Sequence, residues 1–220
     1  MKTKLVVTAV LFIVSLFIYG CANNPSDSSD ANNSVLDQVD QELNSSVLDK
    51  FAYLDLSDSE IASLKFMREE EKLARDVYSV FYRKYNMVIF KNINKSETVH
   101  TNAIKYLLNK YGIEDPSAID QPGVFANQDL QNLYNQLIGR GNVSAIEALK
   151  VGALIEEVDI LDLIHQLNEE VNNQDIVYVY NKLKNGSQNH LRAFVKNLSL
   201  QGIQYTPIYL DPILYNSIIR

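Results

Sequence analysis

Four long stretches of this 220-residue chain repeat apolar residues every three or four positions, the spacing of one face of an α-helix. They cover residues 57–81, 94–111, 142–170 and 175–199. The segment Ser57-Asp58-Ser59-Glu60 has the pattern of a capping box that opens the first stretch. Gly112 and Gly202 end the second and the fourth stretch, and Asn142 is the expected cap of the third. The chain is therefore predicted to be all-α.

The connection between the second and third stretches is long and contains helix breakers. Asp115-Pro116 and Gln121-Pro122-Gly123 interrupt the pattern, and a short helix is expected over residues 128–138. Strand character is confined to two short stretches, 87–90 and 204–210. Four long helices with one long crossover between the second and third predict a four-helix bundle.

The N-terminus has the pattern of a targeting segment. Residues 1–20 are typical of a secretory signal, with two lysines ahead of an apolar run over 5–18. This run is shorter than the roughly 20 residues of a membrane span. The segment Ile18-Tyr19-Gly20-Cys21 resembles the lipobox of a bacterial lipoprotein. The resemblance implies lipid on Cys21 and a place in the bacterial cell envelope, outside the cytoplasmic membrane. The alternative is an uncleaved anchor helix.

The rest of the chain divides into two parts. Residues 21–55 are expected to form a flexible tether, polar at first, with a weak amphipathic pattern over 35–55 that predicts a short helix. Residues 56–220 form the predicted bundle domain, and its tail, 205–220, is expected to pack along the outside.

Composition excludes several classes of function. The formal net charge of −7 argues against general affinity for nucleic acid, which depends on lysine and arginine. A lone cysteine excludes an internal disulfide framework and a zinc site built from several thiolates. The glycine-rich patterns GxGxxG and GxxxxGK[ST] are both absent, so no phosphate-binding loop of these types is predicted.

Several ionisable residues fall on the apolar, inward-facing stripes. They are Glu71 on the first helix, Glu97 and His100 on the second, Glu156 and Asp159 on the third, and His190 on the fourth. Burying unpaired charge is costly, so such positions need an explanation. Residues three apart face the same point from one helix, so Glu97 and His100 can offer a carboxylate and an imidazole to one metal ion. The four carboxylates carry −4, which neutralises two divalent ions.

Other interpretations of these residues stay open at this stage. Glu97 could complete a capping box with Asn94. The run Glu69-Glu70-Glu71 could face water, and Arg75 could pair with Glu71 one turn away. His190 alone could be a hydrogen-bonded histidine at the edge of the core.

Four segments together resemble the ferritin-like superfamily, and more closely its uncharacterised branch called domain of unknown function 2202. They are Met67 to Tyr78, Glu97-Thr98-Val99-His100, Gly152 to Ile160, and Gly186 to Phe194. The first also resembles the Glu-x-x-Ala-Arg motif of rubrerythrins, which selects Glu71 as a ligand. The resemblance implies a carboxylate-bridged pair of Fe or Mn ions. One half-site would hold Glu71, Glu97 and His100, and the other a glutamate of the third helix with His190.

The resemblance has one departure. Ferritin-like proteins usually carry a glutamate three residues before the histidine of the fourth helix, and here that residue is Ser187. Asp159 or Glu157 could supply the missing carboxylate. Glu156 is preferred to Glu157 only because it continues the apolar stripe.

Two functional hypotheses follow. The first is a lipid-anchored, ferritin-like protein with a di-iron or di-manganese site that oxidises Fe(II) or reduces dioxygen or peroxide. In it, Tyr78 would donate a hydrogen bond or an electron, or simply fill the core. The second is a non-catalytic metal-binding or interaction lipoprotein, which Ser187 favours. The expected partners are metal ions, dioxygen or peroxide, the membrane through Cys21 and, as an option, a second copy of the chain.

Overall fold

The computed structural model describes residues 42–220 and contains seven α-helices and no strand over that range. The helices are α3 (Ser45–Leu48), α4 (Asp58–Tyr85), α5 (Val88–Lys110), α6 (Gln128–Gly141), α7 (Ala145–His165), α8 (Gln174–Leu200) and α9 (Pro212–Ile219). The predicted all-α class is confirmed. The predicted signal and Cys21 lie outside the described residues.

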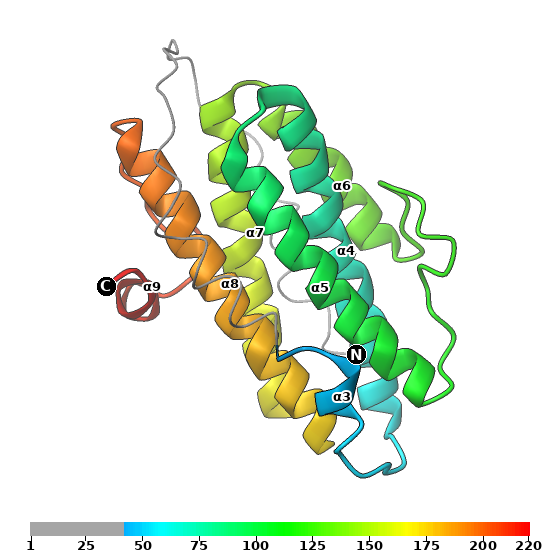
Figure 1. Ribbon diagram of the computed structural model, residues 1–220. Helices are drawn as coiled ribbons and strands as arrows, with labels where there is room; N and C mark the ends of the chain where they lie inside the picture. Colours follow the sequence, from blue (N-terminus) through cyan, green and yellow to red (C-terminus); the bar gives the residue numbers. More distant parts are fainter. Residues whose placement is uncertain (1–41) are drawn as a thin grey trace.

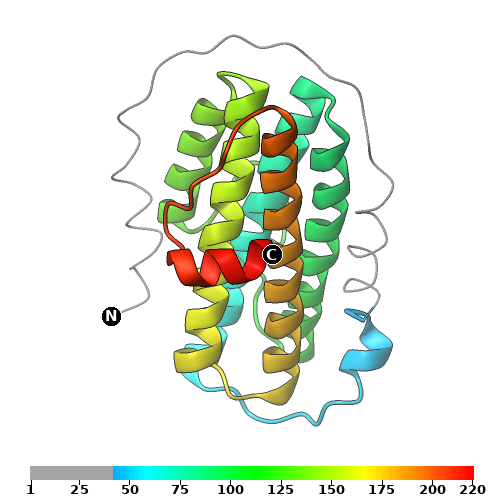
Figure 2. The same cartoon turned by 90° about the vertical axis from the view of Figure 1, so that its left-hand side faces the viewer.

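The four long helices α4, α5, α7 and α8 run side by side (Figure 1). α4 packs against α5 and α7, and α8 packs against the same two helices, so the four form a closed ring around a common interior. Asn86 and Met87 alone join α4 to α5, and residues 171–173 lead into α8. Residues 111–144 form the long crossover, in which α6 packs against α4 and α7. α9 lies across α7 and α8 (Figure 2).

Local capping explains where the helices begin and end. The Ser57 hydroxyl accepts a hydrogen bond from the Glu60 amide, and the Glu60 carboxylate accepts one from the Ser57 amide, so the predicted capping box is present. Asn86 ends α4 in the left-handed conformation, with φ of 51°. The predicted cap of the third helix was wrong. Ser144 caps α7 by accepting from the Glu147 amide, and Asn142 instead ends α6.

Both predicted strand stretches were wrong. Met87 is the N-cap of α5, and residues 88–90 form its first turn, because Phe90 is buried there against Phe81 and Phe194. Residues 204–210 form no strand, because the chain bends at 208–210, where the backbone amides donate to a side chain of α7 rather than to another strand. The end of the third predicted helix is also irregular, because Gln166–Glu170 is π-helical.

The interior has two apolar clusters. One contains Phe81, Phe90 and Phe194, and the other contains Leu64, Ile104 and Leu183, among others. Along α4, α5 and α8, buried ionisable residues lie between the part of the helix that belongs to one cluster and the part that belongs to the other. The fold therefore places a layer of buried polar groups between two apolar cores.

No helix among residues 42–220 combines the length and apolar character needed to cross a membrane.

Candidate metal centre

Five ionisable side chains meet inside the ring of helices. Glu71 comes from α4, Glu97 and His100 from α5, Glu156 from α7 and His190 from α8, and each is at most 2% exposed. On α4, α5 and α8 these residues face inward because they share the apolar stripe of their helix. The structure thus brings together five of the six residues preferred from the sequence.

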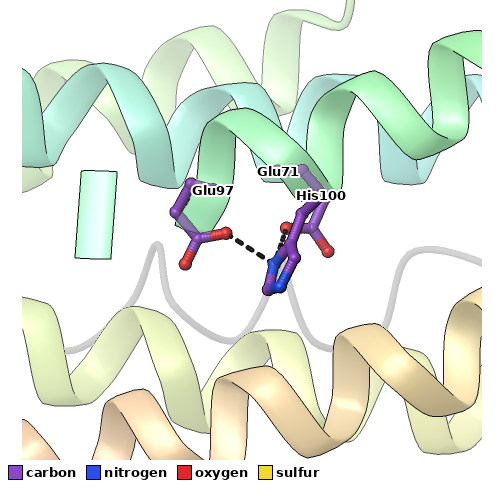
Figure 3. A group of neighbouring side chains, drawn as sticks. All are labelled: Glu71, Glu97 and His100. Atoms are coloured by element: carbon purple, nitrogen blue, oxygen red, sulfur yellow. Dashed lines mark hydrogen bonds and ion pairs between the residues drawn. The ribbon is translucent and has the colours of Figure 1, made fainter. Parts of the chain in front are cut away.

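The first group contains Glu71, Glu97 and His100, whose side chains converge from α4 and α5 (Figure 3). His100 Nδ1 lies 3.0 Å from Glu97 Oε2 and 3.2 Å from Glu71 Oε2. One ligand atom from each residue lies within 4.8 Å of the others. Two carboxylates and an imidazole at this spacing could hold a metal ion.

The second group contains Glu97, Glu156 and His190, and it meets the same distance criterion of 4.8 Å. His190 Nδ1 lies 2.8 Å from Glu97 Oε1 and 3.4 Å from Glu156 Oε2. The two imidazole rings stack 5.5 Å apart. Glu97 therefore belongs to both groups and presents a different oxygen to each histidine, as a carboxylate that bridges two ions would.

The chemistry of the donor set fits a cation. Glu71 Oε1, Asp159 Oδ1 and His190 Nε2 are buried without a hydrogen-bond partner among the described residues. The 2.8 Å contact between His190 Nδ1 and Glu97 also lacks hydrogen-bond geometry. Buried polar atoms are normally satisfied, and leaving them bare costs free energy. A metal ion would accept the lone pairs of these atoms, which no hydrogen bond uses.

Burial and mutual charge set the protonation of the cluster. Burial raises the pKa of Glu71 to about 8, although His100 opposes the rise. Burial alone would lower the pKa of His190, but the charges of Glu156 and Glu97 outweigh it and raise the pKa to about 10. Burial acts to raise the pKa of Glu97, but the charges of His190 and His100 and the hydrogen bond from His100 lower that pKa well below its usual range.

Metal binding should therefore release protons. At pH 7 both Glu71 and His190 hold a proton, because their pKa values lie above 7, and a metal ion binds only the deprotonated forms. We expect about two protons released per chain at pH 7, and weaker binding as the pH falls. Calorimetric titration with Mn(II) in buffers of different ionisation enthalpy measures this release. A binding enthalpy that is the same in every buffer would contradict the expectation.

Asp159 lies beside the cluster but outside both groups. Its Oδ2 accepts a hydrogen bond from the Ser187 hydroxyl. Burial and the charges of Glu71, Glu156 and Glu97 raise its pKa well above the usual range. Ser187, which replaces the glutamate that the resemblance predicted, thus holds the nearest spare carboxylate. Tyr78 donates to Glu156 Oε1 at 2.5 Å, so its hydroxyl orients a residue of the second group.

Glu157, the alternative to Glu156, points away from the cluster. Its carboxylate accepts hydrogen bonds from the Tyr205 hydroxyl at 2.6 Å and from the amides of residues 208–210 at 2.8 to 2.9 Å. It therefore fastens the C-terminal tail to α7. Glu156 faces the histidine instead, and that it binds metal stays a prediction.

The variant Glu157→Gln should loosen the tail and spare the centre. An amide oxygen accepts less strongly than a carboxylate, and the new NH₂ group would face backbone N–H groups. We expect the free energy of unfolding to fall by about 3 kcal/mol, which is the upper end of the contribution that a hydrogen bond to a charged group makes. Urea unfolding measures it, with Glu147→Gln on the same helix as control, since the Glu147 ion pairs are partly exposed. Loss of bound metal in Glu157→Gln would contradict this role.

The other sequence interpretations can now be judged. Glu69, Glu70 and Glu71 are all buried, so a run facing water was wrong. Glu69 accepts from the amides of Ala126 and Asn127 at the start of α6. Arg75 pairs with Asp76 and Asp120 rather than with Glu71. Asn94 cannot cap a helix that begins at Val88, and its side chain donates to the Arg75 carbonyl.

Sequence reasoning also missed a glycine beside the cluster. A Cβ atom on Gly186 would lie 2.7 Å from His100 Cε1 and Nε2. α8 can therefore pack this close to the imidazole only because residue 186 has no side chain. The signal was present as an isolated glycine within a helical pattern, which often marks a close approach.

Together the fold and the site define a class: an all-helical protein whose buried glutamates and histidines could bind metal. Residues 60–220 match the model of the uncharacterized protein domain DUF2202. The chain belongs to this family, as the sequence resemblance predicted.

A relative in the family supports this assignment. Uncharacterized protein MJ0754 of Methanocaldococcus jannaschii is 49% identical over 164 residues, which cover 74% of this chain and 88% of the relative. The crystal structure of hypothetical protein MJ0754 from Methanococcus jannaschii superposes with a TM-score of 0.75 at 48% identity, covering 77% of this chain and 97% of that one. That relative is itself uncharacterised, so function must be argued from the site.

Proposed function

We propose that this protein is a ferritin-like, two-metal carboxylate protein that binds iron or manganese and oxidises Fe(II) or reduces dioxygen or peroxide. The observation that carries the proposal is the position of Glu97. One of its oxygens faces the group of Glu71 and His100, and the other faces the group of Glu156 and His190. A shared carboxylate between two ligand groups is the central element of a two-metal site.

The order of the ligands along the chain supports the ferritin-like assignment. The first long helix supplies a glutamate, the second a Glu-x-x-His pair, the third a glutamate and the fourth a histidine. The connections are short, long and short, with α6 in the long one. Ferritin-like bundles share this connectivity, with carboxylates and histidines projecting inward.

The residues of the chain would then hold, orient and shield the metals. Bound iron or manganese would supply redox chemistry toward dioxygen or peroxide, with electrons from Fe(II) as substrate or from a partner. Glu97 would bridge the two ions, while Glu71, His100, Glu156 and His190 would complete their ligands. Tyr78 keeps Glu156 oriented through its hydrogen bond, and the apolar clusters on either side exclude bulk water.

We also propose that the protein acts while anchored by lipid on Cys21 in the bacterial cell envelope. The support is the lipobox-like segment that ends at this residue. Incorporation of labelled fatty acid by cells producing the full chain, and its loss in Cys21→Ser, tests this. Equal labelling of the two chains would contradict it.

A second candidate function is a bundle that binds metal without catalysis. Ser187 favours this function, because its hydroxyl donates a hydrogen bond to Asp159, whereas a glutamate at this position would supply a further carboxylate. Each group then has one carboxylate of its own and shares Glu97 with the other.

Metal analysis of the chain without residues 1–20 tests the proposed function. After anaerobic loading with Fe(II) or Mn(II), we expect about two ions per chain. His190→Ala should lose metal, while His165→Ala should keep it, since the His165 side chain is partly exposed near the end of α7 and outside both groups. No bound metal after loading would overturn the proposal. Oxygen uptake on adding Fe(II) then separates catalysis from binding alone.

A further inference from the structure

A small cavity lies between α4, α6 and α7, beside the candidate metal centre. Seven of its nine lining residues are aliphatic, and they include Leu73 and Ala74 of α4, Leu133 and Leu137 of α6, and Val158 of α7. The other two are Glu70 and Asp159. The cavity has about 20 Å³ of space for the centre of a water-sized molecule, which is enough for one small molecule.

Its position ties the cavity to the cluster. Glu70 directly precedes Glu71, and Ala74 lies on the same stripe one turn further along α4. On α7, Asp159 follows Glu156 by one turn and accepts a hydrogen bond from Ser187, which lies three residues before His190 on α8. The cavity therefore ends at the residues that border both ligand groups.

The seven aliphatic residues favour an apolar guest, whereas Glu70 and Asp159 have buried carboxylate oxygens without a hydrogen-bond partner among the described residues, to which a water could bind. A water molecule in a buried cavity needs two to four polar partners, whereas aliphatic walls accept an uncharged molecule with little polarity. Hydrogen peroxide is polar at both ends and would leave donors facing the leucines. Dioxygen is apolar, has the right size, and is a reactant of the proposed function.

We propose that this cavity binds dioxygen and supplies it to the metal centre, with α6 as its outer wall. The inference rests on the proposed function, and it also gives the crossover helix a role. Leu133 and Leu137 of α6 line the cavity together with residues of α4 and α7, so α6 forms one of its walls. An ordered water bound to Glu70 and Asp159 is the competing occupant.

The first arm of the test asks whether the cavity takes an apolar guest. Crystals of the metal-loaded protein under xenon pressure should show xenon between Leu137 and Val158. Val158→Ile should lose the xenon, because the added methyl group fills part of the cavity. Val179→Ile is the matched control, since Val179 is also buried, on α8, and does not line the cavity. An ordered water in place of xenon would overturn the proposal.

The second arm asks whether dioxygen bound in the cavity is used in the oxidation of Fe(II). With Fe(II) supplied, Val158→Ile should raise the KM for dioxygen several-fold and leave kcat at saturating dioxygen unchanged, while Val179→Ile should change neither. Equal KM values in the two variants would overturn the supply role even if xenon binds. Metal content separates the two failures, because a protein that binds no metal contradicts the proposed function itself, whatever xenon does.

Discussion

Glu97→Gln should remove both metal ions at once. The two ligand groups share only this residue, and each uses a different oxygen of it. The amide carries no charge and offers a single acceptor oxygen, so the variant lacks the bridge and one of the negative charges that balance the ions. We expect less than about a tenth of the wild-type metal content, since losing ligands of a site typically lowers affinity by orders of magnitude.

The single-group variants provide the comparison. Glu71→Gln should weaken only the group with His100, and Glu156→Gln only the group with His190. Each should therefore keep about one ion per chain, half of the wild-type content. Elemental analysis after dialysis measures all three proteins, and far-ultraviolet circular dichroism checks that each retains its helices. If Glu97→Gln keeps one ion, Glu97 belongs to a single group and the bridge is wrong.

Much of the fold was predictable because its helices are amphipathic and well capped. The four long helices overlap the stretches that the apolar repeats predicted, although α5 begins at Val88 rather than near Asn94 and α7 ends at His165, and the capping box at Ser57 begins α4 as expected. The inward positions of Glu71, Glu97 and His190 followed from the same repeats, since a residue on an apolar stripe faces the core whatever its chemistry. That these residues bind metal remains a prediction.

The choice between Glu156 and Glu157 could not be made from the sequence for a physical reason. α7 is buried on nearly all sides, with α6, the tail and two long helices against it, so both glutamates are at most 1% exposed. A helix that is apolar all round has no stripe to fix which residue faces the bundle interior. Only the partners separate them, namely the histidine for Glu156 and the tail amides for Glu157.

The strand predictions failed because short apolar runs are ambiguous. The residues 88–90 would suit a strand, but a two-residue turn brings them back onto α4, where burial of Phe90 favours helix. The cavity beside Asp159 was also beyond prediction, since it depends on how far apart three helices pack rather than on any one pattern.

Gly186→Ala should disturb the centre without replacing any of its proposed ligands. The new Cβ atom would lie 2.7 Å from the ring of His100, closer than real Cβ contacts allow, so either the imidazole or α8 must move. His100 is fully buried and held beside Glu71 and Glu97, which leaves the ring little room to retreat. We expect about 1–3 kcal/mol lower stability from overpacking. We also expect the group with His100 to lose its ion while the group with His190 keeps one.

Gly139→Ala is the matched control, because it makes the same substitution in a helix where a Cβ atom would meet nothing within 4 Å. There alanine should raise stability by about 0.5–1 kcal/mol, since glycine costs more backbone entropy in a helix. Urea unfolding and metal content of the two variants separate the local clash from a general intolerance of change. Full metal content in Gly186→Ala would mean that the imidazole can shift and still bind. In that case the absence of a side chain at Gly186 serves helix packing rather than the metal centre.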